Sequence, residues 1–329
     1  MPMSDKLRWG VIATGHIARK FAAAVRMSET GRLVAVGSRS MASADAFADE
    51  FDIPHRHASY EALVTDEQVQ AVYVATPHPM HAPSTMMAIK AGKAVLCEKP
   101  FAVNAVEARR VIAAARQAKL FLMEAMWSRF LPPIRKAAQL VKSGAIGEPR
   151  MIMADFGFRG RWEPDSRLLN ANLAGGGLLD VGIYPISLAG MFFGPARAVA
   201  AQAHIGETKV DEQAGMVLKY DDGRLAVLAT GVRTETPMEA WILGTEGKIH
   251  FHREWWRGNP LTVLAKGKDP ETISPEVAEN GFVYEVEEVG RCIAEGKKES
   301  DIMGLDETIS IMETMDEIRR QVGLRYPFE

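Results

Sequence analysis

The chain has 329 residues, of which 47% are hydrophobic and 25% charged, and its net charge at pH 7 is -3. This composition is typical of a folded protein, and the length exceeds what one compact core usually holds, so two domains are expected. Basic residues are scattered and form no run, which argues against nucleic acid or an anionic membrane as a partner and favours a small polar substrate.

The first 124 residues alternate between short apolar runs and amphipathic segments, which predicts alternating strands and helices. Strands are expected over 7–13, 33–37, 71–75, 94–98 and 120–123, and helices over 17–27, 42–51, 83–91 and 105–118. Nearly every strand residue is apolar, as in a parallel sheet that crossover helices cover on both faces. Residues 1–124 are therefore predicted to form a doubly wound Rossmann domain of the α/β class.

The pattern changes after residue 124, where a helix over 131–142 is followed by half-polar runs. Strands are expected over 150–158, 198–204, 212–220, 224–231, 239–243 and 248–252, and closing helices over 282–295 and 306–321. Turns such as Asp221-Asp222-Gly223 and Thr245-Glu246-Gly247 separate several of these strands, which is typical of hairpins. Residues 125–329 are therefore predicted to form an α+β domain on an antiparallel sheet.

The cysteine content and the lengths of the apolar runs indicate the cellular compartment and whether a metal site is expected. Cys97 and Cys292 are the only cysteines, so the sequence offers neither a disulfide framework nor a C-x-x-C metal motif, and no histidine cluster stands out. The N-terminal residues lack the apolar stretch of a secretory signal, and no segment approaches about 18 continuous apolar residues. A cytoplasmic protein without a membrane partner and without a metal is expected.

The turn after the first strand is a variant of the dinucleotide-binding fingerprint. It reads Ala13-Thr14-Gly15-His16-Ile17-Ala18, with Ala13 where the pattern has its first glycine. Gly15 would let the backbone approach a pyrophosphate, and the N-terminus of the next helix would stabilise its charge. The motif alone is weak, and an ordinary strand-to-helix turn is the alternative.

The end of the second strand bears on the choice between NAD and NADP. NAD-specific sites generally place an acidic residue there, to accept hydrogen bonds from the ribose hydroxyls. This chain has Gly37-Ser38-Arg39-Ser40, in which Arg39 could pair with a 2'-phosphate and stack on the adenine. NADP is favoured over NAD, and a solvated surface arginine is the alternative.

Two later strand ends carry polar motifs at the edge where doubly wound sheets bind ligands. One reads Thr76-Pro77-His78-Pro79-Met80-His81 and the other Cys97-Glu98-Lys99-Pro100. Lysine is rarely placed near a core without a task or a partner, which makes Lys99 a candidate functional residue; a surface ion pair is the alternative. His81 could contact a cofactor or cap a helix.

A third motif lies in the second predicted domain. The glycine run Gly175-Gly176-Gly177 begins a predicted helix on which Asp180 and Tyr184, four residues apart, share one face. A carboxylate and a phenol on one face can present a proton donor to a substrate oxygen, and a nearby cation would make the phenol more acidic. Taken alone, such a pair is more often structural.

In their order and spacing, these motifs together resemble the glucose-fructose oxidoreductase, inositol dehydrogenase and rhizopine-catabolism (Gfo/Idh/MocA) family over nearly the whole chain. The resemblance implies a Rossmann domain followed by a domain built on a large open, mostly antiparallel sheet. The exposed face of that sheet would pair subunits into a homodimer or homotetramer. The resemblance also implies that Lys99 is catalytic and that Tyr184 stands where much of the family has a catalytic histidine.

Two further segments resemble the branch of dimeric dihydrodiol dehydrogenases and NADP-dependent xylose dehydrogenases. They are Glu124-Ala125-Met126-Trp127-Ser128-Arg129-Phe130 and the terminal Tyr326-Pro327-Phe328-Glu329. That branch uses NADP, in agreement with Arg39. The resemblance places Trp127 and Arg129 near the cofactor and Trp162 at the substrate pocket.

The expected activity is hydride transfer between a nicotinamide and a sugar, polyol or dihydrodiol. Tyr184 would take the hydroxyl proton, Lys99 would stabilise the developing negative oxygen, and Asp180 would orient Lys99 or the substrate. The expected cofactor residues are Thr14, Gly15, His16, Ile17, Ser38, Arg39, Thr76, Pro77, His81, Glu98, Lys99 and Arg129, and the expected substrate residues are Lys99, Trp162, Asp180 and Tyr184. The alternatives are an NAD-linked inositol or hexose dehydrogenase, a ketose reductase of the same fold, and a weakly catalytic dinucleotide-binding sensor.

Overall fold

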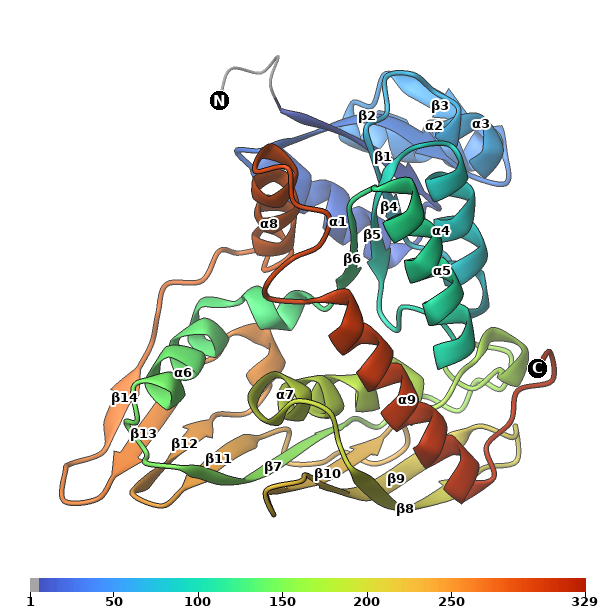
Figure 1. The fold of residues 1–329 in the computed structure, drawn as a ribbon. Coiled ribbons are helices and arrows are strands. Elements are labelled where there is room, and N and C mark those ends of the chain that lie inside the picture. The colour runs from blue at the N-terminus through green and yellow to red at the C-terminus, as the bar shows by residue number, and fades with distance from the viewer. Residues whose placement is uncertain (1–5) are drawn as a thin grey trace. The chain divides into compact units, whose positions relative to one another are not determined.

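A computed structural model describes residues 6–329, which form two compact units (Figure 1). The first unit contains the chain up to Trp127 together with Ala278–Thr308, and the second contains Ser128–Val277 together with Ile309–Glu329. The first boundary between the units follows Trp127, close to residue 124, where the change in sequence pattern predicted it. The segment 278–308, which was expected in the second domain, belongs to the first unit.

The first unit is built on a six-stranded parallel sheet in the order β3-β2-β1-β4-β5-β6. The strands are β1 (Leu7–Ile12), β2 (Gly31–Gly37), β3 (His55–His57), β4 (Ala71–Val74), β5 (Ala94–Glu98) and β6 (Leu122–Ala125). Every residue of the central strand β4 is buried, as expected for a parallel strand covered on both faces. The strand order reverses between β1 and β4, and ligands bind such sheets beside this point, at the carboxyl ends of the strands.

The helices of this sheet begin where the sequence supplies caps. They are α1 (His16–Met27), α2 (Met41–Phe51), α3 (Tyr60–Val64), α4 (His81–Lys90) and α5 (Ala105–Ala118). Ser40, Ser59 and Asn104 accept hydrogen bonds from backbone N–H groups at the starts of α2, α3 and α5. The sequence did not predict β3 or α3, because a three-residue strand and a five-residue helix are too short for a periodic pattern.

The helix α8 (Val283–Ala294) explains why the chain returns to the first unit. The Ser28 hydroxyl, just after α1, donates to the Glu287 carboxylate at 2.7 Å, and the Asn280 amide donates to the Lys20 carbonyl at 2.7 Å. The ring of Trp127 stacks on Phe282, with centroids 5.0 Å apart. These contacts link residues about 155 to 260 positions apart in the chain, so no local pattern indicates them.

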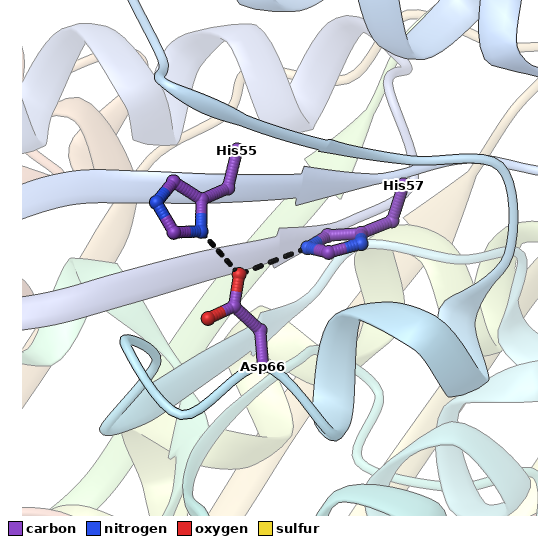
Figure 2. Close-up of side chains that lie close together, drawn as sticks. All are labelled: His55, His57 and Asp66. Carbon is purple, nitrogen blue, oxygen red and sulfur yellow. Dashed lines mark hydrogen bonds and ion pairs between the residues drawn. The ribbon is translucent and has the colours of Figure 1, made fainter.

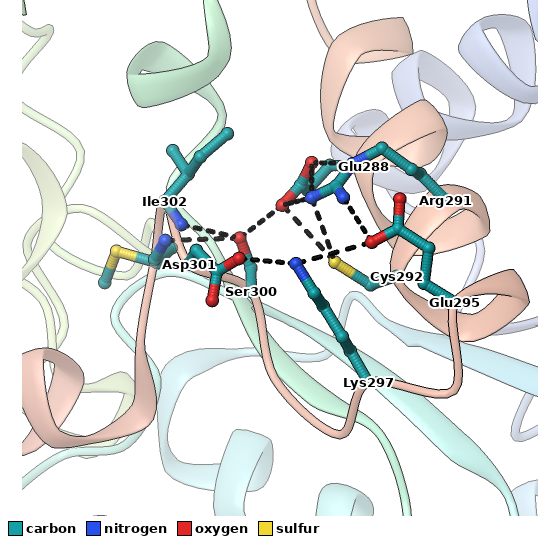
Figure 3. Close-up of polar contacts among 9 residues, drawn as sticks. Glu288, Arg291, Cys292, Glu295, Lys297, Ser300, Asp301 and Ile302 are labelled. Atoms are coloured by element: carbon teal, nitrogen blue, oxygen red, sulfur yellow. Dashed lines mark hydrogen bonds and ion pairs between the residues drawn. The ribbon is translucent and has the colours of Figure 1, made fainter.

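A polar network fixes the turn after α8 (Figure 3). The buried Glu288 carboxylate accepts hydrogen bonds from Arg291 at 2.9 Å and from the Ser300 hydroxyl at 2.5 Å. Cys292 lies in the same network, and burial raises the pKa of its thiol to about 12. Both Cys97 and Cys292 are buried free thiols, and the role of Cys292 here is structural.

The second unit is built on an eight-stranded sheet in the order β14-β13-β12-β11-β7-β10-β9-β8. Only the β7–β10 pair is parallel, so the expected large, mostly antiparallel sheet is confirmed. The strands are β7 (Pro149–Gly157), β8 (Ala198–Ile205), β9 (Asp211–Lys219), β10 (Leu225–Gly231), β11 (Ala240–Gly244), β12 (Gly247–Phe251), β13 (Leu261–Ala265) and β14 (Glu271–Ile273). The last two were not predicted.

Helices α6 (Pro132–Lys142) and α7 (Ile183–Phe193) belong to the second unit, and α9 (Leu305–Val322) crosses the division between the units. Among the described residues, one helical stretch, Ala171–Phe193, is long and apolar enough to span a membrane by length and composition. The stretch contains Asn172, Asp180 and Ser187, so it is not a continuous apolar run of the kind that the sequence analysis sought. Because 83% of the apolar window is buried within the protein, this stretch is the core helix of the second unit.

Candidate active site

The fingerprint turn joins β1 to α1 and leaves open space at Gly15. Ala13 adopts a φ of 77°, the left-handed conformation that glycine takes without steric cost. A Cβ atom built on Gly15 would meet no atom within 4 Å, whereas one on Gly10 would lie 3.0 Å from Val69. Packing thus requires a glycine at position 10, but packing does not explain the glycine at position 15. The backbone at Gly15, the N-cap of α1, is accessible to a phosphate, so the turn fits the pyrophosphate of a dinucleotide.

The end of β2 presents Arg39 to solvent. The Ser38 N–H donates to the His57 carbonyl at 3.1 Å, and the Ser40 hydroxyl caps α2, so the backbone on both sides of Arg39 is fixed. Burial raises the pKa of the Tyr60 phenol, and the nearby Arg39 guanidinium opposes that rise. The Ser-Arg-Ser sequence provides hydrogen-bond donors and a positive charge for a phosphate group.

His81 joins the two polar motifs at the carboxyl ends of β4 and β5. Its ring nitrogens lie 2.7 Å from the carbonyl oxygen of Thr76 and 2.7 Å from that of Pro100. The side chain is 1% exposed. His81 therefore holds the Thr76-Pro77 loop beside the Lys99-Pro100 turn, and its contact with a cofactor remains a prediction.

Glu98 anchors the start of the Lys99 turn. Its carboxylate accepts hydrogen bonds from the Tyr73 hydroxyl and, at 3.2 Å, from the Lys99 N–H. The Tyr73 ring stacks on Phe21 of α1, with centroids 3.7 Å apart. Burial is the main cause that raises the pKa of Tyr73 well above its ordinary value, so the phenol remains a hydrogen-bond donor. The half-buried Lys99 thus follows a rigid, buried strand end.

In the second unit, Asp180 and Tyr184 lie on consecutive turns of a buried helix. Asp180 is on the π-helical segment η5 (Leu178–Gly182), and it accepts two hydrogen bonds from the Arg167 guanidinium, at 3.0 and 3.1 Å. The Tyr184 ring lies beside Phe156 of β7, with centroids 5.3 Å apart. Phe156 stacks on Trp256 at 3.4 Å. A charged, bidentate ion pair and an aromatic wall therefore adjoin the two predicted catalytic groups of this unit.

The glycine run before η5 is held by Asp211, a residue that the sequence did not single out. The Leu178 N–H donates to the Asp211 carboxylate at 2.6 Å, and a Cβ atom on Gly176 would lie 2.2 Å from the other carboxylate oxygen. Gly176 also has a φ of 109°, which only glycine adopts readily. Burial raises the pKa of Asp211 to about 7. The glycine is thus needed for a close approach to this buried carboxyl group.

Two other predicted site residues lie in the second unit. Arg129 is 2% exposed, and it donates to the Ser187 hydroxyl at 2.7 Å and to the Ser187 carbonyl at 2.6 Å, one helical turn after Tyr184. Trp162 is 44% exposed, and the Arg233 guanidinium lies 5.2 Å from its ring centroid. Arg129 fixes the position of α7, and the cofactor role of Arg129 and the substrate role of Trp162 remain predictions.

Comparisons with known proteins agree with these features over the length of the chain. Residues 7–126 match a family described as oxidoreductases with an NAD-binding Rossmann fold, and residues 134–250 match the GFO/IDH/MocA C-terminal domain. Trans-1,2-dihydrobenzene-1,2-diol dehydrogenase of Danio rerio is 38% identical, over 97% of this chain and 98% of the relative. The enzyme of the same name from Mus musculus is 36% identical over 98% of each chain.

Two solved structures of oxidoreductases are also similar to this chain over nearly its whole length. The aldose-aldose oxidoreductase of Caulobacter crescentus, complexed with glycerol, has a TM-score of 0.88 and 27% identity over 97% of this chain and 98% of that one. A 3-ketoreductase of Actinomadura kijaniata, complexed with NADP and TDP-benzene, has a TM-score of 0.86 and 27% identity over 96% and 98%.

The Rossmann unit with its accessible turn, together with full-length matches to oxidoreductases, defines the protein as a nicotinamide-dependent oxidoreductase. More specifically, the chain belongs to the Gfo/Idh/MocA family. The resemblance inferred from the four motifs is confirmed.

Proposed function

We propose that this protein is an NADP-dependent oxidoreductase that transfers a hydride between the nicotinamide and a CH–OH or carbonyl group of a sugar, polyol or dihydrodiol. Lys99 and Tyr184 form its proton relay. The observation that carries the proposal is the placement of the motif residues. Lys99 follows the buried end of β5, while Asp180 and Tyr184 are buried on one helix, in a chain that matches oxidoreductases over nearly its full length.

The choice of NADP rests on the fingerprint turn and on the end of β2. The open space at Gly15 fits a pyrophosphate, and Ser38-Arg39-Ser40 offers a positive charge and no carboxylate. The structure of the 3-ketoreductase contains NADP. The residues that would hold the cofactor are Thr14, Gly15, His16, Ile17, Ser38, Arg39, Thr76, Pro77, His81, Glu98, Lys99 and Arg129.

When bound, NADP supplies the nicotinamide ring that exchanges the hydride. In the oxidation direction, Tyr184 takes the proton of the substrate hydroxyl, and the Lys99 ammonium stabilises the negative charge that develops on oxygen. Asp180, fixed by Arg167, orients a substrate hydroxyl. In the reduction direction, Tyr184 returns the proton to the oxygen.

The substrate class follows from the relatives and from the groups around Tyr184. Relatives are named as dihydrodiol dehydrogenases, and one related structure contains glycerol. A paired carboxylate suits hydroxyl groups, and the wall formed by Phe156 and Trp256 suits the flat, apolar face of a ring. A sugar, a polyol or a cyclic dihydrodiol meets both requirements.

The test compares Lys99→Ala and Tyr184→Phe with the unaltered protein, by the rate of NADP⁺ reduction at saturating concentrations of a panel of pentoses, hexoses, polyols and dihydrodiols. Loss of a proton-transfer group is expected to lower kcat by about 10² to 10⁴. The Kd for NADP⁺ should change little in Tyr184→Phe, because Tyr184 is not among the residues expected to hold the cofactor. Lys90→Ala, at an exposed position, and Tyr284→Phe serve as matched controls. Full activity of both site variants would overturn the relay. Tight NADP⁺ binding without turnover of any substrate would favour the sensor alternative.

We also propose that the protein is a homodimer or homotetramer paired through the sheet of the second unit. Met153, Val217 and Val227 are 44%, 39% and 38% exposed. They are direct neighbours across β7, β10 and β9, and Trp241 continues the row on β11. Since α7 packs on β7 and β10 from the other side, this apolar row is available to a second copy. A cytoplasmic location is proposed from the two free thiols alone.

A further inference from the structure

The edge of the first unit holds a group of potential metal ligands (Figure 2). His55 and His57 are two residues apart on β3, so their side chains point to the same face of the strand. The His55 Nδ1 atom lies 2.6 Å from one Asp66 carboxylate oxygen, and the His57 Nε2 atom lies 3.0 Å from the same oxygen. The sequence expectation that no histidine cluster offers a metal site thus does not hold for the residues that the structure describes.

The donor set suits a transition metal. Two imidazole nitrogens and one carboxylate oxygen are the ligands that Zn²⁺ and its neighbours prefer, whereas Mg²⁺ and Ca²⁺ prefer oxygen ligands alone. Ligands bound to one Zn²⁺ at about 2.1 Å lie about 3.4 Å from one another in a tetrahedron. The potential ligand atoms all lie within 4.8 Å of one another, so small movements of the histidine rings would create the required spacing.

The carboxylate is fixed before any ion binds. The Gln68 N–H donates to the second Asp66 oxygen at 2.8 Å, and the Lys93 ammonium donates to the Asp66 carbonyl at 2.8 Å. The Asp66 side chain is 8% exposed, while those of His55 and His57 are 40% and 21% exposed. A largely buried carboxyl group thus lies behind two histidines that solvent can reach.

We propose that His55, His57 and Asp66 bind one divalent transition-metal ion of the Zn²⁺ class, with water completing its coordination. The site is structural, since it joins the edge strand β3 to the loop after α3. It is separate from the catalytic residues proposed above, so its occupancy can be measured without any assay of activity.

The test uses the full chain without a histidine tag, freed of metal by a chelator. Titration with Co²⁺, followed by its visible absorption, and with Zn²⁺, followed by calorimetry, is expected to show one equivalent bound and a rise in Tm with Zn²⁺. His57→Gln and Asp66→Asn should each weaken binding at least tenfold. His252→Gln, which removes a histidine from the second unit, should leave binding unchanged.

A second measurement covers the case in which a variant fails to fold. Anomalous diffraction at the zinc edge from crystals soaked in Zn²⁺ should place the ion within bonding distance of the three side chains. Absence of saturable binding to the unaltered protein would overturn the proposal. It would also be overturned if the ion lay elsewhere in the crystals and His57→Gln bound the metal as tightly as the unaltered protein.

Discussion

Arg39 is the residue on which the proposed cofactor preference depends. A hydrogen bond to a charged group contributes about 1.5 to 3 kcal/mol, so Arg39→Ala should weaken NADP⁺ binding by about 10- to 100-fold. Binding of NAD⁺, which lacks the 2'-phosphate, should change little. Fluorescence titration with both cofactors measures the two effects. Arg26→Ala, which removes another exposed arginine of the same unit, is the control, and a preference of the unaltered protein for NAD⁺ would contradict the assignment.

Gly15 offers a second test at the scale of one residue, because the structure separates its two conceivable roles. A methyl group at this position meets no protein atom, so Gly15→Ala should leave the Tm of the cofactor-free protein nearly unchanged. The same methyl group would occupy the space expected for the pyrophosphate, and should weaken NADP⁺ binding by about tenfold or more, or at least 1.4 kcal/mol. A large fall in Tm without cofactor would show that Gly15 serves the fold instead.

At the scale of an element, the segment η5 is held by the buried carboxyl group of Asp211, whose pKa burial raises. The folded-state pKa of Asp211 is about 7, above the value of about 3.9 for an unfolded chain. The folded state therefore holds the proton more tightly. The contribution of Asp211 to the free energy of unfolding is greatest below pH 4 and is lost as the pH rises through 7.

Asp211→Asn should remove that dependence. The amide can still accept the Leu178 N–H, and it carries no charge at any pH. Urea unfolding at pH 5 and pH 8 should show that the unaltered protein loses more stability than the variant between these values, by a few kcal/mol. Asp221→Asn, in an exposed turn, is the control. Equal losses in the variant and the unaltered protein would show that Asp211 is already charged at pH 5.

At the scale of the whole molecule, the proposed oligomer depends on an exposed apolar row of the second unit. Val217→Lys combined with Val227→Lys would place two charges on adjacent strands of that face, where burial against a second copy would be costly. Sedimentation velocity should show a shift from dimer or tetramer to monomer. Val106→Lys, at a valine that is 78% exposed on α5 of the first unit, should leave the assembly unchanged; monomeric unaltered protein would contradict the proposal.

The two sheet types, the order of most elements and the family could all be predicted before the structure was known. Burial repeats every two residues in a half-buried strand and every three to four residues in an amphipathic helix, and a fully buried strand is apolar throughout. A local pattern of apolar residues therefore indicates these elements directly. The motifs at residues 13–18, 76–81 and 98–100 were found because each follows a strand, and the carboxyl ends of parallel strands meet at one edge. The family followed from the resemblance of these motifs, in their order and spacing, to those of known proteins.

The contacts between distant residues could be seen only in the folded structure. It placed 278–308 in the first unit, paired Arg167 with Asp180, set Asp211 against the glycine run, and brought Asp66 to His55 and His57. Most of these contacts involve a loop or a short element without periodicity. The placement of 278–308 involves a helix that was predicted, but its contacts lie far away along the chain. Such contacts depend on how the sheets fold and which loops they bring together, and that information is absent from any local stretch of sequence.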